Sequence, residues 1–342
     1  MKKKNYILKI NKLEKFIPYF SGTKKNKVTE IKAVDGVDLD VIRGEMLGVV
    51  GESGCGKSTL GRTILRITEP TKGKILYHEF TKKSKNINII DITSLSKRRL
   101  KYLRKDLQII FQNPYSSLNP RMKIKSILLE PFQIHGLHKE SDIEENILSL
   151  IDLVGLKSEH LNRYPFEFSG GQRQRIGIAR ALALKPKLIV ADEAVSSLDV
   201  SVQAQIVNLM KNLQIKLSLT YIFISHNLSL VKYICDRVAV MYLGKIVEIA
   251  KTDDIFNNPK HPYTEALLSS VPKPNPSYDN KRIILKGEIP DSFNKPTGCQ
   301  FHTRCRYVKT ICTKIEPYLK KSSNTHYSSC HFSNEIYFKG IN

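Results

Sequence analysis

The sequence predicts an α/β fold with a mainly parallel sheet, a helical insertion and a loop-rich C-terminal extension. Short apolar runs of strand length occur at Glu45–Val50, Lys187–Ala191, Thr220–Ile224 and Arg237–Tyr242. Helical patterns alternate with these runs, which is typical of strands that lie parallel in one sheet. The stretch Ser126–Leu184 is mainly helical and interrupts the alternation, so we expect it to form an inserted subdomain.

Two further segments complete the expected order of elements. A Gly-rich turn follows Val50 and leads into a helix expected over Lys57–Ile67. The segment His78–Lys105 is polar and basic, so we expect a surface excursion with a short helix near Leu95–Arg104.

The C-terminal part of the chain is richer in proline than the rest. After about Asp254 the frequent prolines keep helices short; they are Pro259, Pro262, Pro272, Pro274, Pro276, Pro290 and Pro296. We therefore divide the chain into a domain of residues 1–255, with a helical subdomain at about 113–180, and an extension of residues 256–342.

The composition is that of a globular protein. Hydrophobic residues make up 41% of the chain and charged residues 25%. No apolar run approaches the roughly 18 residues that a membrane-spanning helix needs, so we expect a cytosolic location. The formal net charge of +23 admits contact with nucleic acid or anionic lipid. The basic residues are dispersed along the chain, which favours a solvated, lysine-rich surface instead.

A phosphate-binding loop follows the first apolar run. Residues 51–58, Gly-Glu-Ser-Gly-Cys-Gly-Lys-Ser, fit the pattern GxxxxGK[ST] between a strand and a helix. The glycines let backbone N–H groups point at phosphate oxygens, Lys57 would reach the β- and γ-phosphates, and the Ser58 hydroxyl would bind Mg²⁺. The expected nucleotide contacts are Gly51, Glu52, Ser53, Gly54, Cys55, Gly56, Lys57, Ser58 and Thr59.

An acidic pair ends a later apolar run. Asp192 closes the sequence Leu-Ile-Val-Ala-Asp, where a carboxylate can bind Mg²⁺ through water. Glu193 follows directly and is the candidate to polarise the attacking water. Together with the phosphate-binding loop, this pair predicts hydrolysis of a nucleoside triphosphate.

The segment Phe168-Ser-Gly-Gly-Gln172 resembles the LSGGQ signature of the ABC ATPase family. The resemblance implies a RecA-like P-loop NTPase core, an antiparallel β subdomain and an inserted helical subdomain that carries the signature. It further implies a head-to-tail dimer in which the signature of each chain contacts the ATP held by the other. The signature contacts would come from Ser169, Gly170, Gly171 and Gln172.

Other elements of the family stand in order around the signature. Gln112 matches the glutamine that contacts metal and water, so the resemblance implies Ser58, Gln112 and Asp192 as the Mg²⁺ site. Asp199 matches the D-loop aspartate, and His226 matches the histidine that contacts the γ-phosphate. Phe16, Tyr19 and Phe20 all remain candidates for stacking on adenine. Ala194 departs from the family, because proline usually follows the catalytic glutamate there.

Several segments are similar to the oligopeptide/dipeptide permease branch of the family. They are Asn113–Arg121, Pro259–Leu268, Gly287–Pro290 and Gly298–Cys305. The chain has one phosphate-binding loop and no long heptad pattern, unlike tandem or chromosome-type members. The resemblance implies the second of two ATPase subunits in a peptide importer. Its expected partners are a sister ATPase, two transmembrane permease subunits and an extracellular solute-binding protein, without nucleic acid.

This assignment carries two alternatives. An importer of nickel or another small solute belongs to the same branch, whereas a soluble ABC ATPase acting on nucleic acid is favoured only by the basic charge. The expected location is peripheral, at the cytoplasmic face of the cell membrane.

Four of the six cysteines cluster near the C-terminus, at Cys299, Cys305, Cys312 and Cys330. Four thiolates can complete a tetrahedral zinc site or hold an iron–sulfur cluster. The quartet resembles one in the permease branch, in which some members carry a [4Fe–4S] cluster. A cluster, a zinc ion and four free thiols remain as three interpretations.

Overall fold

A computed structural model describes residues 5–20, 28–80, 87–137, 140–272, 282–291, 293–323 and 325–341. The chain divides into two compact units, which we name by the motifs they contain. The signature unit comprises Met1–Ile7, Ile42–Glu45 and Ser94–Ile224, and the P-loop unit comprises Leu8–Val41, Met46–Thr93 and Ser225–Asn342.

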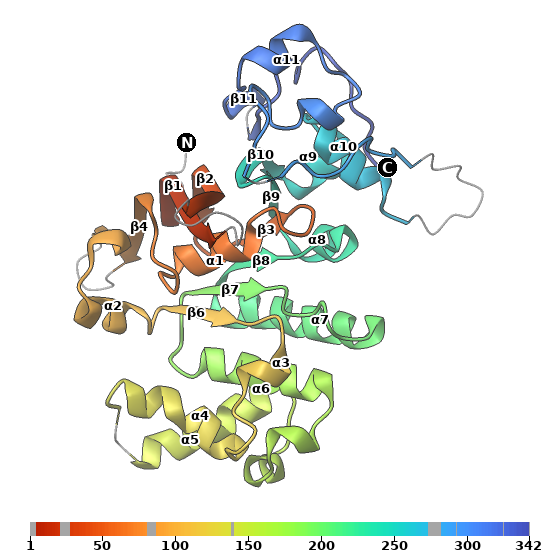
Figure 1. Cartoon of the computed structure of the whole chain (residues 1–342). Coiled ribbons are helices and arrows are strands. Elements are labelled where there is room, and N and C mark those ends of the chain that lie inside the picture. Colours follow the sequence, from red (N-terminus) through yellow and green to blue (C-terminus); the bar gives the residue numbers. More distant parts are fainter. Residues whose placement is uncertain are drawn as a thin grey trace. The chain divides into compact units, whose positions relative to one another are not determined.

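Three parallel strands form the core of the signature unit (Figure 1). They are β6 (Leu107–Ile110), β7 (Leu188–Asp192) and β8 (Thr220–Ile224), with β7 between the other two. Every residue of β7 and β8 is buried, which explains their uninterrupted apolar sequences. Both strands were predicted from those sequences.

The signature unit is rich in helices, and those that cover the stretch from Ser126 to Leu184 confirm the expected helical stretch. The helices of this unit are α2 (Lys97–Leu103), α3 (Pro114–Ser117), α4 (Ile124–Ile134), α5 (Glu140–Leu153), α6 (Gly170–Leu182) and α7 (Val200–Leu217), with 3-10 turns at Ser158–Asn162 and Pro165–Glu167. Ile143, Ile147 and Ile151 recur every four residues on one buried face of α5. Burial of such faces holds the helices together.

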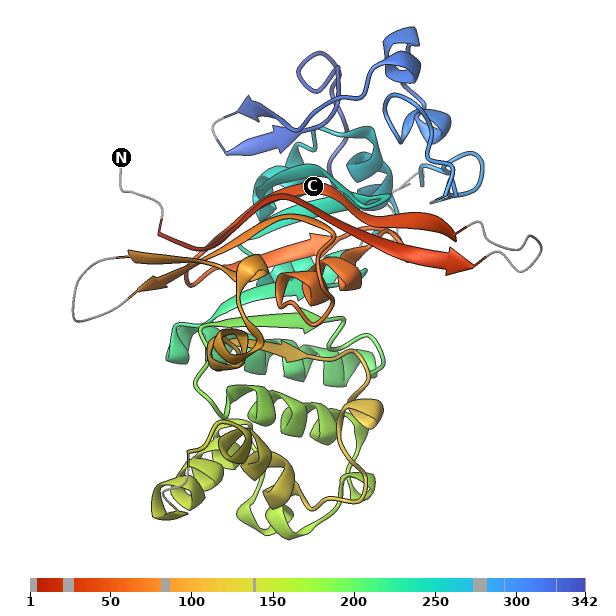
Figure 2. The same ribbon diagram turned by 60° about the vertical axis from the view of Figure 1, so that its left-hand side comes forward.

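Most residues of an antiparallel sheet of four strands belong to the P-loop unit, and this sheet confirms the expected β subdomain. Its order is β2 (Val28–Ile42), β1 (Tyr6–Phe20), β4 (Lys72–Phe80) and β5 (Ile87–Asp91), and Figure 2 shows the long strands β1 and β2 side by side. A 3-10 turn follows at Ile92–Ser94.

The structure corrects the expected surface excursion at His78–Lys105. Its first part is paired strand, because β4 and β5 form a ladder from Phe80↔Ile87 to Leu76↔Asp91. Ile87 and Ile89 are about half exposed, at 50% and 55%, so β5 lacks the buried apolar stripe that identifies a strand in sequence. The expected short helix is present as α2.

The second sheet portion of the P-loop unit carries the phosphate-binding loop. Strand β3 (Met46–Val50) lies parallel to β9 (Arg237–Tyr242), and β9 pairs antiparallel with β10 (Lys245–Lys251). Helices in this unit are α1 (Lys57–Ile64), α8 (Leu228–Ile234), α9 (Thr252–Asn257), α10 (Pro262–Ser269) and α11 (Thr310–Lys314), with a 3-10 turn at His302–Arg304.

The C-terminal extension is loop-rich, as expected, but it does not form a separate appendage. Its strands β12 (His326–Ser328) and β11 (Lys320–Ser323) continue the sheet from β10, with Glu248 opposite Ser328. Phe301 and Phe338 are buried. The extension therefore shares both hydrogen bonds and core with the strands that carry the phosphate-binding loop.

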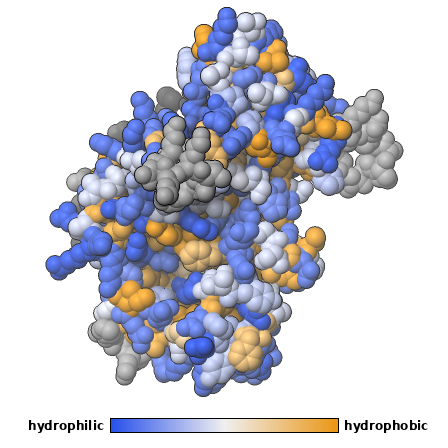
Figure 3. Space-filling view, viewed as in Figure 1, coloured by the Kyte–Doolittle hydropathy of each residue, from blue (hydrophilic) through white to orange (hydrophobic). Residues whose placement is uncertain are grey.

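No helix among the described residues combines the length and the hydropathy that crossing a membrane requires. On the face in Figure 3, hydrophilic residues are spread over the surface and apolar residues occur in small scattered groups.

Candidate functional site

The phosphate-binding loop runs from the end of β3 to the start of α1. Gly51 and Gly56 have φ angles of 154° and 105°, which favour glycine over residues with a Cβ. A Cβ on Gly51 would lie 2.2 Å from the Met241 carbonyl oxygen, and one on Gly56 would lie 2.1 Å from that of Ala33. The fold therefore requires glycine at both positions, and α1 begins at Lys57 directly after them.

Lys57 lies over the loop and is buried, with 4% of its surface exposed. Its Nζ donates hydrogen bonds to the carbonyl oxygens of Gly51 and Glu52, each at 2.9 Å. The ammonium group also lies 3.8 Å from the Sγ of Cys55. Burial raises the pKa of that thiol, although Lys57 opposes the shift, so Cys55 stays protonated at neutral pH. The positive charge is thus held where the loop is expected to receive phosphate.

Glu52 is anchored to residues that sequence reasoning missed. Its backbone N–H donates to the Tyr263 hydroxyl at 2.8 Å. Its carboxylate accepts two hydrogen bonds from Arg304, at 2.7 and 3.0 Å. Both partners come from the C-terminal extension, more than two hundred positions away along the chain.

The acidic pair at the end of β7 differs in burial and backbone conformation. Asp192 is the last residue of the strand and is 1% exposed. Glu193 has a φ of 48°, an uncommon conformation for a non-glycine residue that directs the chain into a turn. Its N–H donates to the Ile224 carbonyl oxygen at 3.1 Å, and its own carbonyl accepts from the Ser196 N–H at 3.1 Å. The first bond ties the turn to the neighbouring strand β8, and the second closes the turn itself.

The structure brings Gln112 and Glu193 together. The Gln112 Nε2 donates to the Glu193 Oε2 at 2.8 Å. Gln112 follows β6 and Glu193 follows β7, and these strands are parallel neighbours, so their carboxyl ends meet at one edge. With Nε2 committed to Glu193, the amide oxygen of Gln112 is the atom left for a metal ion or water.

The signature forms the start of helix α6. Ser169 is the N-cap: its Oγ accepts from the Gln172 N–H at 3.3 Å, and its N–H donates to the Gln172 side chain at 3.0 Å. This reciprocal pair is a capping box. Ser169 is exposed, and the first N–H groups of a helix lack intrahelical acceptors, so the segment has the properties of an anion-binding site.

Asp199 and His226 lie just before the starts of two other helices. Asp199 is the exposed N-cap residue of α7, and its side chain makes no capping hydrogen bond. His226 is exposed and directly precedes Asn227, whose side chain caps α8 through the N–H groups of Ser229 and Leu230 at 3.0 and 3.3 Å. The phosphate-binding loop and His226 belong to the P-loop unit, whereas the other predicted catalytic and signature residues belong to the signature unit.

Comparison with known proteins decides the family. A family model described as ABC transporter matches residues 34–196, and one described as oligopeptide/dipeptide transporter, C-terminal region, matches residues 247–312. The oligopeptide transport ATP-binding protein AppF of Bacillus subtilis is 50% identical over 328 residues, which cover 95% of this chain and 97% of AppF. The chain belongs to the ABC transporter family.

Further comparisons agree with this family. The dipeptide transport ATP-binding protein DppF of Haemophilus influenzae is 48% identical over 318 residues, covering 93% of this chain and 94% of DppF. The dimeric structure of MJ0796, a bacterial ABC transporter cassette, aligns with a TM-score of 0.60 and 26% identity over 72% of this chain and 98% of that cassette. The chain is thus an ATP-binding and ATP-hydrolysing ABC subunit of the oligopeptide/dipeptide transporter group.

The three aromatic candidates for adenine stacking differ in their surroundings. The Lys32 and Lys72 ammonium groups lie over the Phe16 ring, 5.4 and 5.9 Å from its centroid. The Tyr19 ring packs against Phe293 at 4.6 Å between centroids. The side chain of Phe20 lies outside the described residues. Stacking of adenine on one of these rings stays a prediction for this ABC ATPase.

Ala194, which replaces the proline usual in this family, is 1% exposed. The turn that contains it is held by hydrogen bonds from the Ser196 N–H to the Glu193 carbonyl and from the Leu198 N–H to the Val195 carbonyl, at 3.1 and 3.2 Å. Burial and these two bonds supply local order that the proline ring would otherwise supply.

All four clustered cysteines line one small cavity of about 20 Å³ in the extension. Burial is the main cause that raises the pKa of Cys299 and Cys305 to about 11 and that of Cys330 to about 12. The Cys299 N–H also donates to the Cys312 carbonyl oxygen at 2.8 Å. Within the described residues, however, no three His, Cys, Asp or Glu side chains are arranged to hold a metal ion. This finding supports neither the zinc nor the iron–sulfur interpretation.

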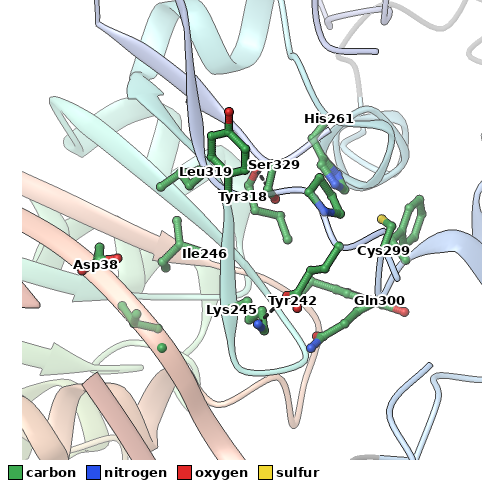
Figure 4. Close-up of a pocket in the computed structure, with 16 residues that line it drawn as sticks. Asp38, Tyr242, Lys245, Ile246, His261, Cys299, Gln300, Tyr318, Leu319 and Ser329 are labelled. Atoms are coloured by element: carbon green, nitrogen blue, oxygen red, sulfur yellow. Dashed lines mark hydrogen bonds and ion pairs between the residues drawn. The ribbon is translucent and has the colours of Figure 1, made fainter. Parts of the chain in front are cut away.

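A larger cavity of about 340 Å³ is lined by residues of strands β2 and β10 and of the extension (Figure 4). It is lined from the strand side by Asp38 and Ile246, and from the extension by Cys299, Gln300 and Tyr318. Its described lining contains none of the residues assigned to ATP, so it is distinct from the nucleotide site.

Proposed function

We propose that this ABC ATPase energises the uptake of peptides across the cytoplasmic membrane. The observation that carries the proposal is the match of residues 247–312 to the oligopeptide/dipeptide transporter C-terminal region. Relatives with 50% and 48% identity are named as oligopeptide and dipeptide transport ATP-binding proteins. In this proposal the chain works at the cytoplasmic face with a sister ATPase, two transmembrane permease subunits and an extracellular solute-binding protein.

The proposed chemistry begins with binding of ATP at the phosphate-binding loop. Lys57 exchanges the Gly51 and Glu52 carbonyls for phosphate oxygens, which its charge attracts more strongly. The Ser58 hydroxyl, the Gln112 amide oxygen and the Asp192 carboxylate are oxygen donors of the kind that suit Mg²⁺. Bound there, the ion would neutralise charge that develops on the phosphates.

Hydrolysis then needs a base and a completed phosphate site. Glu193 accepts a proton from the attacking water, whose oxygen bonds to the γ-phosphorus while the bond to the ADP oxygen breaks. Gln112 orients the Glu193 carboxylate through the 2.8 Å hydrogen bond. Ser169 and the first N–H groups of α6 serve the γ-phosphate of the sister subunit's ATP, and His226 contacts the γ-phosphate of this chain's own ATP.

A transport assay tests the cargo. Loss of Lys57 charge, through Lys57→Ala, should weaken ATP binding and abolish uptake of radiolabelled oligopeptides in cells that depend on this chain. Uptake of nickel should be unchanged in the same cells. Loss of nickel uptake with normal peptide uptake would establish the small-solute alternative instead.

For the cysteine quartet we propose a [4Fe–4S] cluster. Its support is that the four thiols line one cavity. A cluster takes one thiolate at each iron, so its ligands need not converge on a single point as the ligands of one zinc ion must. Because burial raises the pKa values of Cys299, Cys305 and Cys330, their deprotonation would be coupled to binding of the metal.

Purification without oxygen tests the cluster. The protein should be brown and contain about four irons and four sulfides per chain. Cys305→Ser should remove the colour and expose the extension beyond about residue 290 to protease. Cys235→Ser changes a buried cysteine outside the quartet, so this control variant should keep the brown colour. Colourless protein with one zinc would indicate a zinc site, and metal-free protein whose four thiols all react would refute both.

A further inference from the structure

We propose that Arg304 of the C-terminal extension is a positioning residue for ATP binding, which holds the phosphate-binding loop in shape through Glu52. The proposal rests on the assignment of residues 51–59 as the ATP site and adds a residue outside that motif. It makes nucleotide affinity depend on the extension.

The Arg304–Glu52 contact has the geometry of a strong, oriented ion pair. Two guanidinium nitrogens donate to the two carboxylate oxygens at 2.7 and 3.0 Å. The side chains are 7% and 24% exposed, so solvent screens the pair only weakly. Two parallel hydrogen bonds fix the orientation of the carboxylate as well as its position, which a single contact would not.

Tyr263 provides a second anchor on the same residue. Its hydroxyl accepts a hydrogen bond from the Glu52 backbone N–H at 2.8 Å. Its ring is fully buried, and the ring centroid lies 4.7 Å from that of Tyr242 and 5.4 Å from that of Phe301. Burial raises the pKa of the Tyr263 phenol, so this partner stays neutral. Glu52 is thus held by its N–H, by its side chain and, through Lys57, by its carbonyl oxygen.

The orientation of Arg304 toward Glu52 leaves one of its donors without a hydrogen bond. Within the described residues its Nε is buried without a hydrogen-bond partner. Such an unpaired donor is unfavourable, so the guanidinium takes this orientation because the carboxylate attracts it. Arg304 ends the 3-10 turn His302–Arg304 and directly precedes Cys305, so one short segment carries both the ion pair and a member of the cysteine quartet.

Loss of Arg304 should harm the ATP site in two ways. The Glu52 carboxylate would lose its fixed orientation, and its negative charge would remain unpaired beside the loop. That charge would compete with phosphate for Lys57, which already contacts the Glu52 carbonyl. Removing the charge as well should therefore restore part of the affinity, a result that loss of structure alone would not give.

The test is the Kd for ATP of the full chain, measured at equilibrium. Arg304→Ala should raise the Kd roughly tenfold or more, because hydrogen bonds between charged groups contribute that much. Glu52→Gln should have a smaller effect, and the Glu52→Gln/Arg304→Ala double variant should bind more tightly than Arg304→Ala alone. Arg304→Lys should recover part of the affinity, since lysine keeps the charge but not the paired geometry.

Arg306→Ala is the matched control. Arg306 lies two positions away and pairs with Glu265 at 2.9 Å instead of with the phosphate-binding loop. Its loss should leave the Kd within about twofold of the native value. In the assembled transporter, Arg304→Ala should raise KM for ATP while kcat changes little.

Three results would overturn the proposal. They are an unchanged Kd in folded Arg304→Ala, an equal loss of affinity in Arg306→Ala, and a double variant that binds no better than Arg304→Ala. If Arg304→Ala does not fold, Glu52→Gln and Arg304→Lys test the proposal in its place. Native affinity for ATP in both variants would overturn the proposal. Lys57→Ala distinguishes failure of the Arg304 proposal from failure of the proposed ATP site, because unaltered ATP binding in that variant would refute the ATP site itself.

Discussion

Replacing Glu193 by Gln is expected to slow ATP hydrolysis by roughly 10²–10⁴ while ATP binding is retained. The amide cannot take a proton from the attacking water. Its oxygen can still accept the hydrogen bond that Gln112 donates to Glu193 at 2.8 Å, so the local geometry should survive. Single-turnover hydrolysis and equilibrium binding of ATP in the assembled complex measure the two effects separately.

A second variant changes the charge next to the Glu193 carboxylate. Gln112→Glu places a second carboxylate against Glu193 and should raise the pKa of the pair through like-charge repulsion. Hydrolysis should then shift its rising limb to higher pH, a change that Glu193→Gln cannot show. Glu193→Gln protein with a near-native hydrolysis rate would mean that another group is the base.

The second large effect is expected at Ser169. Ser169→Asp should reduce hydrolysis at the composite site by about 10² or more, because a carboxylate would face the γ-phosphate of the sister subunit's ATP. Ser169→Asn is the matched control. Asp and Asn both cap a helix N-terminus as well as Ser does, so α6 should remain intact in both variants.

Binding of ATP to this chain's own phosphate-binding loop should be unchanged in both Ser169 variants. The measurement is steady-state hydrolysis in the assembled complex beside ATP binding to the isolated chain. Gly171 is a poorer target, because a Cβ there would lie 2.5 Å from the Val202 Cγ1 on α7 and disturb the packing of two helices. If the Ser169→Asp variant were as active as the Ser169→Asn variant, the signature would not contact the γ-phosphate.

Fully buried strands were the elements that the sequence predicted best. The bounds predicted for Thr220–Ile224 and Arg237–Tyr242 are those of β8 and β9. Every residue of β8, and every residue of β9 after Arg237, is buried, so both strands stand out as mainly apolar runs in the sequence. Strand β1 was missed. Its ladder with β4 is irregular between Asn11 and Glu14, and consecutive Ile7 and Leu8 are both buried, so the alternation expected of a half-buried strand is absent.

The predicted site could be assembled from motifs only where each motif is local. The capping box of Ser169 and Gln172, and the glycines beside Lys57, are separated by a few residues and leave a pattern in sequence. The Arg304–Glu52 pair spans 252 positions, so it depends on how the extension folds back on β9 and β10. No local pattern distinguishes Arg304 from Arg306, which pairs elsewhere.

Reconstitution tests the central claim that this chain is one of two ATPases driving peptide import. The tagged chain is purified from membranes in mild detergent, placed in lipid vesicles and assayed for ATP hydrolysis with and without peptide-loaded solute-binding protein. We expect it to co-purify with a non-identical ATPase and two membrane subunits, and peptide to stimulate hydrolysis. Purification of the chain alone, with hydrolysis stimulated by nucleic acid and unaffected by peptide, would contradict the claim.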